Sequence, residues 1–343
     1  MDVTIFSTKP YDRRFLDAAN GAGLHRLSYI EARLSPETSP LVNGAEAVCA
    51  FVNDDVSAAV LSRFREMGIR LVALRSTGFN NVDLEAAQRE GITIARVPAY
   101  SPHAVAEHTL ALILTLNRKI HRAYNRVREG NFTLDGLLGF DLVGKTAGVV
   151  GTGQIGEIVT RILIGFGCDV LVYDPQVNPA CEAMGARYVA LDELLSSSDI
   201  ITLHCPLTPS THHLIDAEAV RKMKRGVMLI NTSRGGVINT KVVLKALKAG
   251  MIGSLGLDVY EEEADLFFED LSNRAISDDV FARLLTFPNV LITGHQAFFT
   301  QEALTSIAET TIANITSFER SGQPVHEVSI DRIARGRGSP NGP

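Results

Sequence analysis

Three short segments of the chain carry side chains that could move protons and bind an anion. They contain Arg234, Glu263 and His295, and each follows an apolar run of strand length. An imidazole exchanges a proton near neutral pH, a carboxylate can hold the other ring nitrogen, and a guanidinium binds a carboxylate through two donors. Because ligands of open α/β sheets bind beyond the carboxyl ends of the strands, we expect the three segments to converge on one crevice.

Each of these side chains also has a structural interpretation. Glu263 ends an acidic run of three residues, and such a run is usually a solvated face; Arg234 could form a surface ion pair, and His295 could be a structural histidine. Five other histidines are interpreted as structural or supporting residues: His103, His108, His204, His212 and His213. No set of His, Cys, Asp and Glu has convincing metal spacing, so no catalytic metal is predicted.

A glycine-rich turn predicts a dinucleotide site. The run Gly151-Thr-Gly153-Gln-Ile-Gly156 lies between a strand-like and a helix-like stretch. Gly151 would allow the tight turn, Gly153 the approach of a pyrophosphate, and Gly156 close packing of helix on strand. The next strand-like run ends at Asp174, whose carboxylate would accept hydrogen bonds from ribose hydroxyls and repel a 2′-phosphate. The pattern therefore favours NAD over NADP. The alternative is a glycine turn beside an unrelated surface aspartate.

The elements that must position these residues form two series of alternating strands and helices. The first series occupies residues 1–98 and the second about 101–296. This pattern predicts an α/β fold with two Rossmann-like, doubly wound parallel-sheet domains and a cleft between them. A last helix at 303–320 is expected to return to the first unit. The predicted division is 1–100 plus 297–333 for the substrate domain, 101–296 for the NAD domain, and a disordered tail at 334–343.

Composition excludes several classes of protein. The net charge of −6 gives no basic face for nucleic acid, and no apolar run reaches the length of a membrane span. The N-terminus lacks the pattern of a secretion signal. The four cysteines contain no CxxC pair and are expected to be reduced thiols, which indicates a cytoplasmic protein.

Up to about residue 330 the chain resembles the D-isomer-specific 2-hydroxyacid dehydrogenases, and within them the lactate branch. The resemblance rests on Arg75-Ser-Thr-Gly-Phe-Asn-Asn-Val-Asp83, Tyr100-Ser-Pro-His-Ala-Val-Ala-Glu-His108 and Gly294-His-Gln-Ala-Phe298. Arg234, Glu263 and His295 match the Arg/Glu/His triad of the family. Many members of the family have Pro-His where this chain has Gly294-His295. This difference puts in question which branch of the family the chain resembles, but not the assignment of the triad.

The resemblance implies a role for each member of the triad. His295 would exchange the proton of the substrate hydroxyl, Glu263 would orient the imidazole, and Arg234 would bind the substrate carboxylate. The implied reaction is the reversible reduction of pyruvate to D-lactate with NADH. The nearest alternative is a larger 2-keto acid of the 2-ketoisocaproate or phenylpyruvate type. A third possibility is an NAD-sensing corepressor that binds peptides.

The resemblance also implies binding residues. The implied cofactor contacts are Val105, Gly151, Gly153, Gln154, Ile155, Gly156, Asp174, Cys205, Pro206, Thr211, Thr232, Ser233, Arg234 and Asp258. The implied substrate contacts are Arg75, Thr77, Gly78, Tyr100 and Phe298, of which the first three could simply form a turn and the two aromatic residues could be core. A homodimer or homotetramer is expected, with its interface at the apolar stretch 109–116 and the segment 132–140.

Overall fold

The computed structural model describes residues 1–21, 23–263 and 266–330. Contacts divide the chain into two compact units. Unit 1 comprises Met1–Ser101 and the segment that begins at Phe299, and unit 2 is Pro102–Phe298. The sequence-based division placed these borders at residues 100 and 297. The tail predicted to be disordered at 334–343 lies outside the described residues.

Unit 1 is built on a sheet with the strand order β13-β5-β4-β3-β1-β2. Its strands pair in parallel, except that the C-terminal strand β13 runs antiparallel to β5. The strands are β1 (Asp2–Ile5), β2 (Arg26–Tyr29), β3 (Ala47–Ala50), β4 (Leu71–Leu74), β5 (Thr93–Ala95) and β13 (Glu327–Val328). The helices are α1 (Pro10–Asn20), η1 (Ser39–Leu41), α2 (Ala58–Glu66), α3 (Leu84–Glu90) and α12 (Gln301–Ser321).

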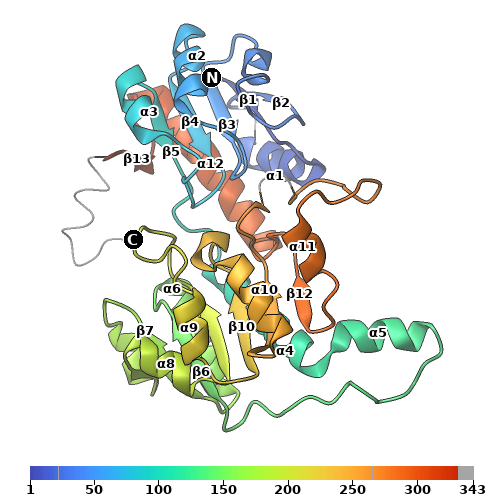
Figure 1. Cartoon of the computed structure of the whole chain (residues 1–343). Coiled ribbons are helices and arrows are strands. Elements are labelled where there is room, and N and C mark those ends of the chain that lie inside the picture. Colours follow the sequence, from blue (N-terminus) through green and yellow to red (C-terminus); the bar gives the residue numbers. More distant parts are fainter. Residues whose placement is uncertain (22, 264–265, 331–343) are drawn as a thin grey trace. The chain divides into compact units, whose positions relative to one another are not determined.

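Both faces of this sheet are buried because successive residues of a strand point to opposite sides. In β3, Ala47 and Cys49 join one apolar cluster, while Val48 and Ala50 join the other. Helix α12 covers the first of these faces together with α1, and it packs against β4 (Figure 1). Helix α12, which follows unit 2 in the sequence, is therefore part of unit 1.

Unit 2 carries the motifs that suggested chemistry. Its strands are β6 (Thr146–Val150), β7 (Asp169–Tyr173), β8 (Arg187–Tyr188), β9 (Ile200–Leu203), β10 (Val227–Asn231), β11 (Ile252–Leu257) and β12 (Val290–Ile292). Its helices are α4 (Pro102–Arg118), α5 (Ile120–Arg128), α6 (Gln154–Gly165), α7 (Pro179–Ala183), α8 (Leu191–Ser197), α9 (Ala217–Lys222), η2 (Gly235–Val237), α10 (Thr240–Lys248) and α11 (Asp279–Leu284).

The strands of unit 2 form a parallel sheet in the order β12-β11-β10-β9-β6-β7-β8. The order reverses between β6 and β9, which is the topological switch point where ligands of such sheets bind. Figure 1 shows β6 and β10 in the middle of this unit, with helices around them. Two apolar clusters fill the space on the two faces of the sheet. The predicted class, an α/β fold with two doubly wound parallel-sheet units, is confirmed.

One detail of the structure differs from the expectations. The apolar stretch 109–116, expected at a subunit interface, has most of its side chains in the core of unit 2, including Leu112 and Ile113. Helices α4 and α5 are separated by Lys119, which adopts a left-handed φ of 49°. Among the described residues, no helix is long and apolar enough to span a membrane. All four cysteines are buried free thiols.

Candidate active site

His295 and Glu263 form a hydrogen-bonded pair at the carboxyl end of the unit 2 sheet. His295 follows β12 and Glu263 follows the neighbouring β11, and the distance from Nδ1 of His295 to Oε1 of Glu263 is 2.8 Å. Their side chains are 16% and 17% exposed, so the pair is shielded but reachable from solvent. A carboxylate has no proton to donate, so Nδ1 of the imidazole donates and Nε2 is left for exchange of a proton.

The backbone holds His295 in an unusual conformation. Its φ of 51° lies in the left-handed region, which is disfavoured for residues other than glycine. The N–H of His295 donates to the carbonyl oxygens of Asp258 at 2.8 Å and Thr293 at 3.1 Å. The second carboxylate oxygen of Glu263 accepts from the N–H of Tyr260 at 3.0 Å. Both partners are therefore held in place by neighbouring backbone, as an acid–base pair requires.

Arg234 lies directly after β10, the next strand of the sheet. The buried Asn231 at the end of that strand fixes the turn, since its Oδ1 accepts from the N–H of Ser233 at 3.0 Å and its Nδ2 donates to the carbonyl of Arg234 at 2.9 Å. The next residue must be glycine, because a Cβ on Gly235 would lie 2.0 Å from the carbonyl oxygen of Tyr260. This close approach joins the Arg234 turn to the segment that carries Glu263.

Asp258 connects three segments of unit 2 through a buried carboxylate. Its Oδ1 accepts from the hydroxyl of Thr293 at 2.6 Å and from the N–H of Gln296, and its Oδ2 accepts from the N–H of Ala297 at 2.9 Å. Nε2 of His108, on helix α4, lies 3.3 Å from Oδ1. The aspartate therefore holds both sides of His295 and ties α4 to that loop.

Replacing Asp258 by asparagine is expected to lower the free energy of unfolding by about 2 kcal/mol at pH 7, because an amide nitrogen would face an N–H donor. Burial raises the pKa of Asp258, but hydrogen bonds from His108 and Thr293 outweigh it and hold the pKa below its ordinary value. A lowered pKa stabilises the folded protein above about pH 4, and this stabilisation is lost as the pH falls through the folded value. Urea unfolding at pH 7 and at pH 3 measures both effects.

The matched control for this prediction is Asp141→Asn, since Asp141 is exposed. The difference in the free energy of unfolding between the wild type and the Asp258 variant should shrink as the pH falls from 4 to 3. The control variant should have the free energy of unfolding of the wild type at pH 7 and at pH 3. Equal stability of Asp258→Asn and wild type at pH 7 would show that the carboxylate does not hold the loop.

The glycine turn has the geometry of a pyrophosphate cradle. Gly151 has a φ of +96°, and a Cβ on Gly156 would lie 1.9 Å from the carbonyl oxygen of Gly151, so both positions need glycine. No atom lies within 4 Å of the Cβ position of Gly153, which precedes helix α6. N–H groups of the first turn of a helix have no partner within that helix and attract phosphate. The open backbone and the helix N-terminus therefore fit the diphosphate of a dinucleotide.

Asp174 follows β7 next to this turn, where the fingerprint requires an acidic residue. Its Oδ2 accepts from the N–H of Thr152 at 2.8 Å, and its Oδ1 accepts from the N–H of Gln176 at 2.9 Å. The hydroxyl of Tyr188 donates to the Thr152 hydroxyl at 2.8 Å, which ties β8 to the same turn. These contacts hold the carboxylate beside the glycine turn, in the place suited to a ribose.

The other predicted cofactor contacts lie after neighbouring strands of unit 2. Cys205, Pro206 and Thr211 follow β9, and Thr232 and Ser233 follow β10. Val105 lies on α4, and the hydroxyl of Thr109 donates to its carbonyl oxygen and lies 2.9 Å from the Thr232 hydroxyl. His204, beneath the glycine turn, is partly buried, and desolvation of its ring lowers its pKa to about 3. His204 is therefore neutral near pH 7 and has no part in proton exchange.

Arg75, a predicted substrate contact, is engaged in hydrogen bonds within unit 1. Its side chain is 2% exposed, and its two terminal nitrogens each donate at 3.0 Å, to the carbonyl oxygens of Phe6 and Ser7. Its Nε pairs with Asp12 at 3.3 Å. A buried guanidinium is stable only when its donors are used in this way, so Arg75 joins β1 and β4 within unit 1.

The remaining predicted substrate contacts are distributed over both units. Thr77 and Gly78 lie in the turn after β4, where the hydroxyl of Ser76 donates to the Gly78 carbonyl oxygen at 2.8 Å. Tyr100 is half-buried at the end of the first segment of unit 1, and Phe298 is a buried residue at the end of unit 2. The roles of these four residues stay predictions.

Three supporting residues were not predicted. Asn231 positions the Arg234 turn, Thr293 binds Asp258, and Thr109 contacts Thr232. The sequence contains a signal for Asn231 and Thr293. Each is a polar residue at or just after the end of a strand, shortly before Arg234 or His295. Thr109 had no such signal, since it stands within an apolar helix and is recognisable only from its contacts.

The amino-acid sequence of this chain is similar to that of known proteins. A family model described as "D-isomer specific 2-hydroxyacid dehydrogenase, NAD binding domain" matches residues 110–297. The D-lactate dehydrogenase of Escherichia coli is 52% identical over 320 residues, which cover 93% of this chain and 97% of the relative.

Solved structures of D-lactate dehydrogenases are similar to this chain as well. An apo-structure of D-lactate dehydrogenase from Escherichia coli matches with a TM-score of 0.88 at 48% identity, covering 96% of this chain and all of that one. A D-lactate dehydrogenase from Aquifex aeolicus, complexed with NAD and lactic acid, matches with a TM-score of 0.83 at 35% identity, covering 94% of this chain and 98% of that one.

Proposed function

Because the chain belongs to the D-isomer-specific 2-hydroxyacid dehydrogenases, we propose that it reduces pyruvate to D-lactate with NADH and catalyses the reverse oxidation. The observation that carries the proposal is the hydrogen bond between His295 and Glu263, which leaves one ring nitrogen for proton exchange. The choice of lactate is supported by relatives that bear the name D-lactate dehydrogenase and align with nearly the whole chain.

Proton transfer is the task of His295. During reduction its Nε2 donates a proton to the C2 oxygen of the keto acid, and during oxidation the same nitrogen takes the hydroxyl proton back. Glu263 accepts a hydrogen bond from Nδ1 throughout, so it keeps the ring oriented and stabilises the positive charge of the imidazolium. A bound NAD supplies the hydride chemistry at its nicotinamide ring.

Arg234 is proposed to bind the substrate carboxylate and to polarise the C2 oxygen. One terminal nitrogen of its guanidinium donates to the carbonyl oxygen of Ser233 at 2.7 Å, so the group is held by its own turn. A planar guanidinium offers five donors, which leaves others for a carboxylate. The amides of Thr77 and Gly78, with Tyr100 and Phe298, are proposed as further substrate contacts.

The test of this proposal is kcat/KM for pyruvate, 2-ketoisocaproate and phenylpyruvate, each measured with NADH and with NADPH. We expect pyruvate with NADH to be preferred by about tenfold or more, since a pocket discriminates by about this factor per small group. The product should be D-lactate by a stereospecific assay. Preference for a larger keto acid would favour the alternative substrate class, and peptide binding without turnover would favour a corepressor.

A second copy of the chain is proposed to cover an exposed apolar patch, as expected for a homodimer or a homotetramer. Seven apolar side chains on α5 and in the segment that follows it are each more than half exposed: Ile120, Tyr124, Val127, Phe132, Leu134, Leu138 and Val143. Large exposed apolar patches usually mark protein contacts. Sedimentation of the purified chain measures the oligomeric state, and a monomer at micromolar concentration would contradict the proposal.

A further inference from the structure

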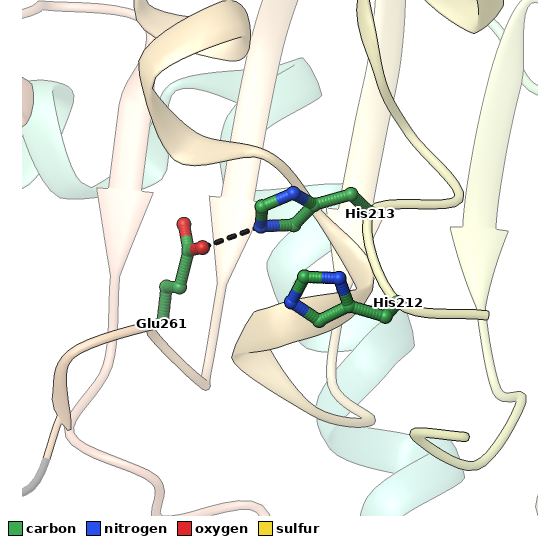
Figure 2. A group of neighbouring side chains, drawn as sticks. All are labelled: His212, His213 and Glu261. Carbon is green, nitrogen blue, oxygen red and sulfur yellow. Dashed lines mark hydrogen bonds and ion pairs between the residues drawn. The ribbon is translucent and has the colours of Figure 1, made fainter. Parts of the chain in front are cut away.

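His212, His213 and Glu261 form a cluster of possible metal ligands outside the site described above (Figure 2). One ligand atom from each residue lies within 4.8 Å of the other two. Nε2 of His213 is 2.5 Å from Oε1 of Glu261, and the two imidazoles stack with ring centroids 3.9 Å apart. Figure 2 shows a nitrogen of His212 on the same side as the His213 nitrogen that meets Glu261.

The backbone is shaped to bring two consecutive histidines to one side. In an extended chain, neighbouring side chains point in opposite directions. His213 instead has a φ of 52°, in the left-handed region, and its N–H donates to the carbonyl oxygen of Gly236 at 2.8 Å. This turn accounts for the stacking of the two rings. A disfavoured conformation that is held by a specific hydrogen bond is a frequent mark of a functional site.

We propose that these three side chains bind a divalent transition-metal ion of the zinc class. Two imidazoles and a carboxylate are a ligand set of Zn²⁺, whose bonds to nitrogen and oxygen are about 2.0–2.2 Å. Tetrahedral geometry at these lengths separates ligand atoms by roughly 3.3 Å, so the His213–Glu261 contact would open by less than about 1 Å. His212 is exposed and the other two side chains are partly exposed, so the ion has an entry path and water can be the fourth ligand.

Other cations fit this cluster less well. Mg²⁺ and Ca²⁺ prefer oxygen ligands, and here two of the three donors are nitrogen. The carboxylate is already oriented, because the N–H of Thr240 donates to its second oxygen at 3.2 Å. This contact limits the movement that the carboxylate needs on binding.

The ion would connect two segments that carry predicted functional residues. His212 and His213 follow β9, in the same stretch as Cys205 and Thr211, and Glu261 stands two residues before Glu263. A metal ion bound to both segments would restrain them relative to each other within unit 2. The ion acts as a clamp next to the acid–base pair and takes no part in hydride or proton transfer.

The test is isothermal titration of chelator-treated, full-length protein with ZnCl₂, in the absence of nucleotide and keto acid. We expect one site per chain and a higher midpoint of thermal unfolding in the presence of Zn²⁺, since an ion that binds the folded state stabilises it. His212→Phe keeps a stacking ring without ligand nitrogens, and Glu261→Gln keeps a hydrogen-bond acceptor without charge. Each should weaken binding by about tenfold or more.

Two further variants make the experiment decisive. Glu262→Gln changes the adjacent exposed carboxylate and should leave the affinity for Zn²⁺ unchanged. His295→Gln should also leave it unchanged, which separates this cluster from an ion bound at the acid–base pair. The proposal is overturned if wild type binds no Zn²⁺, if His212→Phe and Glu261→Gln bind as tightly as wild type, or if binding disappears in His295→Gln.

Discussion

Replacing His295 by glutamine is expected to lower kcat/KM for pyruvate by roughly 10²–10⁴-fold, the usual contribution of a general acid. Glutamine cannot supply the proton that the C2 oxygen takes up in the transition state. It keeps a polar group in the pocket, so the change in shape is small. Steady-state kinetics with NADH measure the loss, and protein fluorescence titration with NADH shows whether the cofactor still binds.

A variant of Glu263, the hydrogen-bond partner of His295, tests how the two residues act together. Glu263 acts on the substrate only through His295, to which it is joined at 2.8 Å. Glu263→Gln should therefore reduce activity in the wild-type background but cost little more once His295 has been replaced. If the loss of kcat/KM in the double variant equalled the product of the losses in the two single variants, Glu263 would have a function independent of the imidazole. Full activity of His295→Gln would remove His295 from the mechanism.

Replacing Arg234 by leucine is expected to cost on the order of 3 kcal/mol of transition-state binding, or more than about 100-fold in kcat/KM for pyruvate. The loss combines a missing counter-charge for the substrate carboxylate with a missing donor to the C2 oxygen. Arg234→Lys should be intermediate, because an ammonium keeps the charge but not the planar pair of donors. Steady-state kinetics over a wide pyruvate range separate the effects on kcat and KM.

A matched control for Arg234 is available at the other end of the same strand. Arg225→Leu removes an exposed guanidinium just before the amino end of β10, whereas Arg234 follows its carboxyl end. The control should retain wild-type kinetics. Near-normal turnover of Arg234→Leu would mean that another group binds the substrate carboxylate, and the amides of Thr77 and Gly78 would then be the next candidates.

The apolar pattern predicted the buried strands well and the edge strands poorly. β9 and β10 are runs of consecutive buried residues, so each stands out in the sequence as a mostly apolar run. β2, with the sequence Arg-Leu-Ser-Tyr, and the two-residue strand β8 are partly exposed edge strands that were not predicted. An edge strand pairs on one side only, and its pairing depends on a neighbour already in place rather than on its own composition.

The direction of a side chain was the least predictable property of the candidate site. Arg75 stands in a motif that suggested a substrate contact, yet its guanidinium points into unit 1 and pairs with Asp12, 63 residues away. His108 stands in another such motif and contacts Asp258, which is 150 residues further along the chain. Neither contact has a local signal, because each depends on how distant segments pack together.

The residues that could do the chemistry were determined by the sequence alone, because an Arg, a Glu and a His each stand just after a strand, and parallel strands end at one edge of the sheet. The glycine turn was equally local, since its conformation depends on glycine itself. Only the tertiary structure decided which ring nitrogen of His295 is bound and what holds Asp258. It also brought His213 within hydrogen-bonding distance of Glu261. Those contacts join residues separated by 32 to 48 positions, and long-range packing alone sets their geometry.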